Sequence, residues 1–172
     1  MTRIILSLCF LIIAGSLAGA DPGEGDYRAE DWVELNKKIR KKFPDAPIIK
    51  VAELEKKDLK DYLILDCRTK REFETSHIKG ALHSEKLDTA KRNLKLQKGR
   101  AVVVYCSVGY RSGKMVEALV KDGAKNVSNL EGSIFTWANR GNPLEDDEGR
   151  STSKVDRYGW RWGKYLRPEN RD

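Results

Sequence analysis

Short apolar runs alternate along this chain with longer segments in which apolar residues recur every three or four positions. The strongest run covers residues 101–105 (AVVVY), where β-branched residues follow one another without a polar break. A continuous run of this kind is typical of a strand that is covered on both faces. Residues 63–65 form a similar shorter run, and residues 48–49 and 126–130 predict two further strands.

The segments between these runs predict helices. A capping box, Thr69 followed by Glu72, indicates the start of one short helix, and residues 77–82 read as a turn and another strand. Strands and helices therefore alternate, which predicts an α/β domain whose sheet carries helices on both faces. Functional sites in such sheets form at the carboxyl ends of the strands. The other predicted helices cover residues 27–43, 51–57, 85–96, 111–121 and 133–139.

An N-terminal helical extension, residues 21–47, precedes the main domain, which we place at residues 48–145. Within it, residues 27–43 carry apolar side chains at helical spacing with Lys and Arg between them, and Pro44 ends the helix. This amphipathic helix is expected to cover part of the core. Its alternative role is a surface for a protein partner or a membrane.

The C-terminal tail, residues 146–172, is basic and contains four large aromatic residues. Leaving all of them exposed would create an unusual apolar patch, so we expect them to fold back on the domain near Trp32. A surface for a protein partner is the competing interpretation. These aromatic residues are Tyr158, Trp160, Trp162 and Tyr165.

The first twenty residues predict a secretory signal peptide rather than part of the fold. Arg3 is followed by an apolar run over residues 4–13 and by small residues up to Ala20. Cleavage is expected after Ala20, with Ala18 as the second choice. An uncleaved anchor is the alternative, but the apolar run is shorter than the roughly 20 residues of a membrane span. We therefore expect a periplasmic or secreted protein with no stable membrane span after cleavage.

The composition fits one globular domain. The chain has 172 residues, of which 40% are hydrophobic and 34% charged, with a formal net charge of +7. This basic excess can steer small anions toward the protein. It does not by itself indicate nucleic acid, and export makes a nucleic-acid partner unexpected.

Two cysteines, Cys67 and Cys106, remain once the leader is removed. The chain has no CxxC motif, and its two histidines, His77 and His83, lack the spacing of metal ligands, so neither a metal site nor a cofactor is expected. In an oxidising compartment these two thiols must pair, stay protected or react.

Cys106 has the surroundings of a nucleophile. It lies between the strongest predicted strand and a helix N-terminus, where loop N–H groups and the helix dipole favour an anion. Gly109 permits the tight turn, and Arg111 adds a permanent charge that can hydrogen-bond an oxyanion. Together these features are expected to lower the pKa of the thiol. A buried, inert cysteine is the alternative.

The Cys106 loop and three other segments of the sequence resemble the rhodanese family. The loop at residues 106–112 looks like the rhodanese active-site loop, and residues 65–68, 72–81 and 129–144 support the match in the right order. The resemblance covers residues 48–145. It implies one rhodanese-type domain with a central, mainly parallel five-stranded sheet.

The resemblance also implies sulfurtransferase activity. Cys106 would attack a donor such as thiosulfate, release sulfite and hold the sulfur as a persulfide until a thiol or cyanide accepts it. Loop amides and Arg111 would stabilise this anion, and the Ser112 hydroxyl would orient the loop. The remaining loop residues would bind substrate mainly through backbone N–H groups, with side chains that shape the mouth: Ser107, Val108, Gly109 and Tyr110.

Two other functions are alternatives. Similar enzymes of this fold, the dual-specificity phosphatases and arsenate reductases, place five residues between cysteine and arginine, whereas residues 107–110 number four here. A smaller ring suits sulfur better than phosphate. The second alternative is a non-catalytic rhodanese-like module that binds a partner or senses redox state.

Two positions depart from the family pattern. Ser133 stands where a second glycine is common, and Cys67 stands where Val is frequent. Similar phosphatases carry a cysteine at the latter position that can pair with the catalytic one. The resemblance therefore implies that Cys67 is a redox partner forming a reversible disulfide with Cys106; a small buried hydrophobic residue is the alternative.

Four polar residues near the site are assigned to structure. Asp66 and Arg68 at a strand end read as an ion pair and cap, and His77 and His83 as turn and packing residues. Sulfur transfer by a thiolate needs no general base, so none of these residues is required to move a proton.

Overall fold

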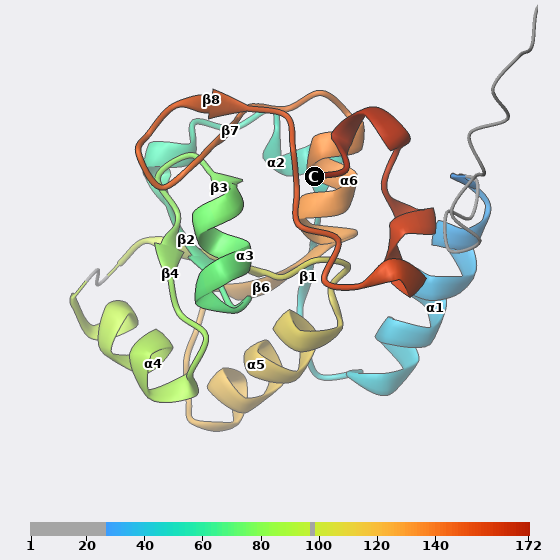
Figure 1. The fold of residues 1–172 in the computed structure, drawn as a ribbon. Helices are drawn as coiled ribbons and strands as arrows, with labels where there is room; N and C mark the ends of the chain where they lie inside the picture. Colours follow the sequence, from blue (N-terminus) through green and yellow to red (C-terminus); the bar gives the residue numbers. More distant parts are fainter. Residues whose placement is uncertain (1–26, 97–98) are drawn as a thin grey trace, which may run out of the picture.

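The fold is built on a five-stranded sheet in which all neighbouring strands are parallel (Figure 1). The structure is a computed structural model that describes residues 27–96 and 99–172. The predicted signal peptide lies outside the described residues. The strands, in sheet order, are β1 (Ile48–Lys50), β6 (Val127–Glu131), β5 (Ala101–Tyr105), β2 (Tyr62–Asp66) and β4 (Leu82–His83).

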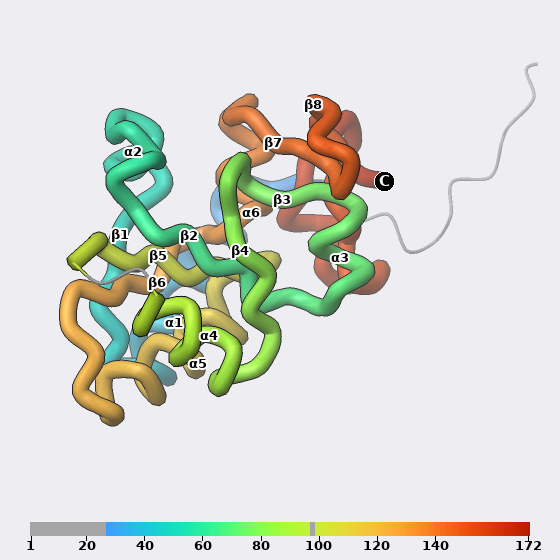
Figure 2. The backbone as a smooth tube through the Cα atoms, turned by 90° about the vertical axis from the view of Figure 1, so that its left-hand side faces the viewer, coloured from blue at the N-terminus to red at the C-terminus, as the bar shows by residue number. Residues whose placement is uncertain are grey.

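Helices cover both faces of this sheet, as the alternation of strands and helices predicts (Figure 2). In the described part of the chain, no helix has the length and apolar character that a membrane span requires. The α-helices are α1 (Asp31–Lys42), α2 (Val51–Leu54), α3 (Lys70–Thr75), α4 (Leu87–Leu96), α5 (Tyr110–Lys121) and α6 (Ser133–Asn139). Short 3-10 helices cover Leu59–Asp61, Trp160–Tyr165 and Pro168–Asn170.

The central strand β5 divides the core into two clusters. Side chains alternate along a strand, so Val102 and Val104 lie on one face and Val103 and Tyr105 on the other. The first pair packs with buried residues of α1, α4 and α5, and the second with residues of α2 and α6. Cys106 continues the first face and therefore lies over the α5 side of the sheet.

A second, three-stranded antiparallel sheet was not predicted. It joins β3 (His77–Ile78), β7 (Leu144–Glu145) and β8 (Ser151–Thr152). Only β4 of the segment 77–82 extends into the main sheet, so the expected turn and strand are divided between two sheets. Strands of two residues carry no periodicity that a sequence pattern can reveal.

The C-terminal tail folds back on the domain as predicted through Trp162 and Tyr165, whereas Tyr158 and Trp160 stay largely exposed. Tyr165 packs edge to face on Trp32 of α1, with ring centroids 5.2 Å apart. Asn139 at the end of α6 bonds the tail twice, through its Nδ2 to the carbonyl of Tyr165 and through its Oδ1 to the amide of Arg167. Figure 1 shows the tail against α1 and α6. The two extensions therefore contact each other.

Asp66 and Arg68 form the predicted structural ion pair at the end of β2. Both side chains are fully buried, and the guanidinium donates to both carboxylate oxygens at 2.7–3.0 Å. Arg68 also donates to the carbonyl of Ser76. The histidines are likewise bonded to backbone, His77 to the carbonyl of Phe73 and His83 to that of Arg68.

Replacing Asp66 by Asn leaves the buried Arg68 charge without its partner, which we expect to cost about 3–5 kcal/mol of unfolding free energy. Urea denaturation of the two proteins measures this difference. The control is Lys38→Ala, which removes an exposed pair with Glu34 in α1 and is expected to cost about 0.3–0.5 kcal/mol. Equal losses in the two variants would contradict the structural role of the pair.

Candidate active site

Cys106 lies at the carboxyl end of the central strand, directly before the loop that leads into α5. Gly109, the residue before the helix, has a φ of 108°, a backbone conformation that side chains rarely permit. The Nδ2 of Asn129 in β6 donates to the Gly109 carbonyl at 3.0 Å. The loop is thus held in a tight turn by a glycine and by a side chain of the neighbouring strand.

The Cys106 sulfur accepts hydrogen bonds from its own loop. The Gly109 amide lies 3.1 Å from Sγ, and the Ser112 hydroxyl lies 3.5 Å from it. The sequence prediction gave Ser112 the role of orienting the loop, whereas the structure places its hydroxyl on the sulfur itself. Of the loop amides expected from the sequence around the anion at residues 107–110, that of Gly109 donates to the sulfur.

Ser133 supports the backbone of the nucleophile. Its hydroxyl accepts a hydrogen bond from the Cys106 amide at 3.2 Å and donates to the Leu130 carbonyl at 3.0 Å. Ser133 adopts a φ of 50°, in the left-handed region where glycine is favoured. The serine that departs from the family pattern therefore supplies a hydrogen bond that glycine could not.

The Cys106 thiol is acidic despite its burial. Burial disfavours the thiolate, but the interaction with the neighbouring Cys67, the positive charge of Arg111 and the hydrogen bond from Ser112 outweigh that effect. The pKa of Cys106 therefore lies well below its ordinary value. A thiolate at neutral pH is the reactive form of cysteine.

From the sequence, Arg111 is expected to stabilise the sulfur anion directly. In the structure its hydrogen bonds go instead to Glu72 of α3. Its two terminal nitrogens donate to the two Glu72 carboxylate oxygens at 2.6 and 2.8 Å, and one also donates to the Ser107 hydroxyl at 2.9 Å. Glu72 is only 1% exposed, and a buried carboxylate needs a counter-charge. Arg111 therefore acts on Cys106 through its charge, while Glu72 holds it in place.

The capping box predicted at the start of α3 is confirmed, and it also holds Glu72. The Glu72 carboxylate accepts hydrogen bonds from the amide and hydroxyl of Thr69. Burial opposes ionisation of Glu72, but the hydrogen bonds and charge of Arg111 outweigh it and lower the pKa of the carboxyl to about 2. One residue thus caps α3 and anchors the arginine of the loop.

The other predicted loop residues play unequal parts. Ser107 uses its side chain, not only its amide, because its hydroxyl also donates to Glu72 at 3.0 Å. Val108 is buried in the core cluster that contains α6. Tyr110 is exposed and packs edge to face on Phe43, with ring centroids 5.0 Å apart.

A cavity of about 180 Å³ reaches the Cys106 loop. The C-terminal tail supplies part of its wall through Tyr158 and Trp162. The Tyr158 ring centroid lies 4.5 Å from the Arg111 guanidinium carbon, a cation–π contact. The complete lining is Cys106, Ser107, Val108, Tyr110, Arg111, Tyr158 and Trp162.

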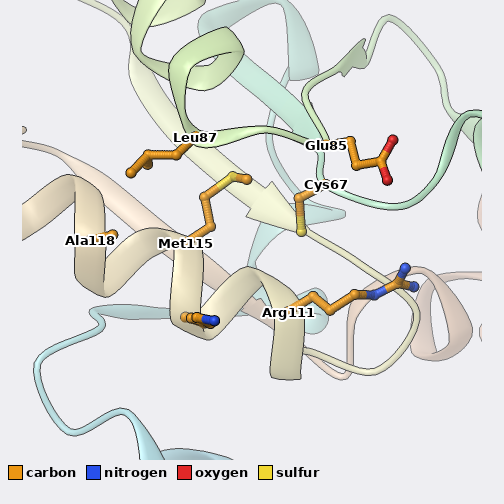
Figure 3. A pocket seen from close by; sticks show the side chains of 7 residues that line it. Cys67, Glu85, Leu87, Arg111, Met115 and Ala118 are labelled. Carbon is orange, nitrogen blue, oxygen red and sulfur yellow. The ribbon is translucent and has the colours of Figure 1, made fainter.

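Cys67 lies beside Cys106 but opens to a different cavity. The Cys67 amide donates to the Tyr105 carbonyl at 2.9 Å, which places the residue beside Cys106. The interaction with Cys106, together with burial, raises the pKa of Cys67 well above its ordinary value. Figure 3 shows the second cavity, of about 420 Å³, lined by Cys67, Glu85, Leu87, Arg111, Lys114, Met115 and Ala118.

The sequence missed several residues that build the site. Glu72 was assigned to the helix cap, Asn129 was named only within a segment that resembles the family, and Tyr158 and Trp162 were assigned to packing. The one available signal was that Glu72 and Asn129 each begin a segment that resembles the rhodanese family. The structure brings the predicted residues 106–112 together at one strand end and adds these residues from α3, β6 and the tail.

The fold and the site define a parallel α/β domain with a cysteine of lowered pKa at the end of its central strand. Residues 50–140 match the family model of the rhodanese-like domain, so the chain belongs to that family. Over 92 residues it is 36% identical to a sulfurtransferase of Allochromatium vinosum, a match that covers 54% of this chain and 86% of the relative.

Two further comparisons agree with this family. The chain is 34% identical over 83 residues to a tRNA uridine(34) hydroxylase of Bacillus cereus, which covers 45% of this chain but only 26% of that relative. A rhodanese-related protein of Thermoplasma volcanium has a similar structure, with a TM-score of 0.50 and 27% identity over 57% of this chain and 96% of the other. The family and the sulfurtransferase relative support an enzyme of the transferase kind.

Replacing Glu72 by Gln removes the charge that holds Arg111, and we expect a loss of about 1.5–3 kcal/mol of unfolding free energy at neutral pH. Because folding lowers the carboxyl pKa from 4.5 to about 2, this stabilisation is complete above pH 4.5. It declines as the pH falls through that interval. Urea denaturation of both proteins across this pH range measures the difference. A difference in unfolding free energy between the two proteins that stays constant down to a pH of about 2 would contradict an ionised Glu72.

Replacing Tyr158 by Ala removes one wall of the smaller cavity and its contact with Arg111. The cation–π contact is worth about 0.5–1 kcal/mol. Because its loss lets the tail open more readily over Cys106, we expect iodoacetamide to alkylate Cys106 roughly 2- to 5-fold faster. Peptide mapping assigns the alkylated cysteine. Trp160→Ala is the matched control, because Trp160 is an exposed aromatic residue of the same tail. Equal rates in both variants and the unaltered protein would show that the tail does not restrict access.

Proposed function

We propose that this chain is a rhodanese-type sulfurtransferase that carries sulfane sulfur as a persulfide on Cys106. The observation that carries the proposal is the sulfur of Cys106, which accepts hydrogen bonds from the Gly109 amide and the Ser112 hydroxyl and has a lowered pKa. A cysteine with a purely structural role would require neither these hydrogen bonds nor a lowered pKa. Membership of the rhodanese-like family and a sulfurtransferase relative support it.

In the first step, the Cys106 thiolate attacks the outer sulfur of a donor such as thiosulfate. A bond forms between Cys106 Sγ and that sulfur, and the bond to the sulfonate sulfur breaks. Sulfite leaves with the electron pair. The charge of Arg111 draws the anionic donor to the smaller cavity, whose lining includes both Cys106 and Arg111.

In the second step, an acceptor thiolate or cyanide attacks the outer sulfur of the persulfide. Cys106 leaves as a thiolate, which the same hydrogen bonds and the Arg111 charge stabilise. No proton has to move to or from Cys106 in either step, since it begins and ends the cycle ionised. This agrees with the backbone-bonded histidines, which are placed for structure.

Two further parts of the proposal concern which sulfur donors enter the cavity and where the reaction takes place. The aromatic wall of Tyr158 and Trp162 belongs to the tail, outside the family match at residues 50–140. We therefore propose that this wall, unlike the loop, is particular to this chain and adjusts which donors enter. Export by the predicted signal peptide would place the reaction in the periplasm or outside the cell.

Replacing Cys106 by Ser should reduce thiocyanate formation from thiosulfate and cyanide to the background rate, because a hydroxyl at this position is neither ionised nor able to hold sulfane sulfur. The measurements are thiocyanate release and the intact mass of the protein after thiosulfate alone, with Trp160→Ala as the control variant. Persulfide formation in the Cys106→Ser protein, or neither sulfite release nor thiocyanate formation by the unaltered protein with several donors, would refute the proposed function.

A further inference from the structure

Cys67 is a second thiol at the site that the proposed transfer does not use. It follows β2 directly, as Cys106 follows β5, and these strands pair in parallel with Asp66 opposite Tyr105. The two cysteines are therefore neighbours on the same face of the sheet, and both belong to the same core cluster. Both are free thiols in the structure.

The distance between the two paired strands allows a disulfide between the cysteines that follow them. Paired strands lie about 4.8 Å apart, within the Cα separation of roughly 4.4–6.8 Å that disulfides span. The pairing continues up to the cysteines, because the Cys67 amide donates to the Tyr105 carbonyl at 2.9 Å. The pKa of Cys106 is lowered and that of Cys67 is raised, so Cys67 is the partner that keeps its proton. The sulfur of Cys67 therefore lies against the inner sulfur of any persulfide formed on Cys106.

The two sulfurs open to different cavities. Cys106 lines the smaller cavity with Tyr158 and Trp162, whereas Cys67 lines the larger cavity on the side of α4 and α5. In Figure 3 the Cys67 sulfur points toward α5, which carries Met115 and Ala118. A reagent in the larger cavity therefore meets Cys67, not Cys106.

We propose that Cys67 resolves the Cys106 persulfide, forming a Cys67–Cys106 disulfide and releasing hydrosulfide, and that the larger cavity admits the thiol reductant that reopens this disulfide. The proposal rests on the proposed function for the persulfide itself. It gives the protein a second product, sulfide, in addition to the sulfur passed to an acceptor.

The step balances without any other oxidant. A bond forms between the sulfurs of Cys67 and Cys106, and the bond between Cys106 and the sulfane sulfur breaks. The sulfane sulfur leaves with that electron pair and with the Cys67 proton as hydrosulfide. The Cys67 sulfur is oxidised, the sulfane sulfur is reduced, and the Cys106 sulfur keeps its oxidation level.

The reductant then acts from the Cys67 side. A thiolate in the larger cavity attacks the Cys67 sulfur, and Cys106 leaves. Thiol exchange is faster when the leaving thiol is the more acidic one, and Cys106 is the acidic partner of the pair. A second thiol then frees Cys67. Among the charged residues that line this cavity, Lys114 and Arg111 outnumber Glu85, and this excess of positive charge favours the attacking thiolate.

The test uses the full chain, reduced, freed of reductant and kept without oxygen, with thiosulfate as the donor. Sulfite release, sulfide release and the non-reduced intact mass are followed together. The unaltered protein is expected to release one sulfide per chain and to lose the mass of two hydrogens. Dithiothreitol, the thiol probe, should restore the free thiols.

Cys67→Ser is the principal variant, because its hydroxyl keeps a hydrogen-bond donor beside Cys106. We expect it to release sulfite, gain the mass of one sulfur atom and release no sulfide. Cys67→Val, a small buried hydrophobic residue, serves as the second variant in case the serine protein does not fold. Both variants should retain the persulfide.

The outcomes separate the two proposals. A persulfide that persists in the unaltered protein, with sulfite but no sulfide released, would overturn the role of Cys67 and leave the proposed function standing. Sulfide release from Cys67→Ser equal to that of the unaltered protein would also overturn it. If no protein releases sulfite or gains sulfur from any of several donors, the proposed function itself fails.

Discussion

Burying a thiolate at the end of the central strand costs free energy unless hydrogen bonds and positive charge offset it. The residues around Cys106 supply both. Donors come from the loop, through the Gly109 amide and the Ser112 hydroxyl, and positive charge comes from Arg111. The arginine would be free to turn to solvent without Glu72, which binds both of its terminal nitrogens. The acidity of the nucleophile therefore depends on an ion pair with a different helix.

The two extensions turn a family domain into a more enclosed site. Helix α1 and the tail both lie outside the matched residues 50–140, and they contact each other through Trp32 and Tyr165. Through this packing the tail is held where Tyr158 reaches Arg111. The same tail aromatic residues that the sequence assigns to packing thus serve both stability and the shape of the cavity.

The sequence predicted what is encoded locally. The strands β2 and β5 contain apolar runs, and α6 matches its predicted bounds at residues 133–139, because each follows from adjacent residues. Cys106 and its loop were found for the same reason. Glu72, Asn129 and Tyr158 could not be assigned, since their roles arise only when α3, β6 and the tail pack around one strand end. Arg111 was assigned to the anion because its competing partner is distant in sequence.

The pair of thiols shows how two identical groups side by side can be given opposite chemistry. The Cys106 sulfur accepts hydrogen bonds from Gly109 and Ser112 and is influenced by the charge of Arg111, so its pKa falls while that of Cys67 rises. The acidic partner is suited to attack a donor and to leave from a disulfide, and the protonated partner keeps its proton until a leaving sulfur can take it. Because the two open to separate cavities, entry of donor and entry of reductant need not compete. A valine at position 67 would keep the packing and lose this division of roles, which is why the proposed chemistry, and not the packing alone, depends on a cysteine at this position.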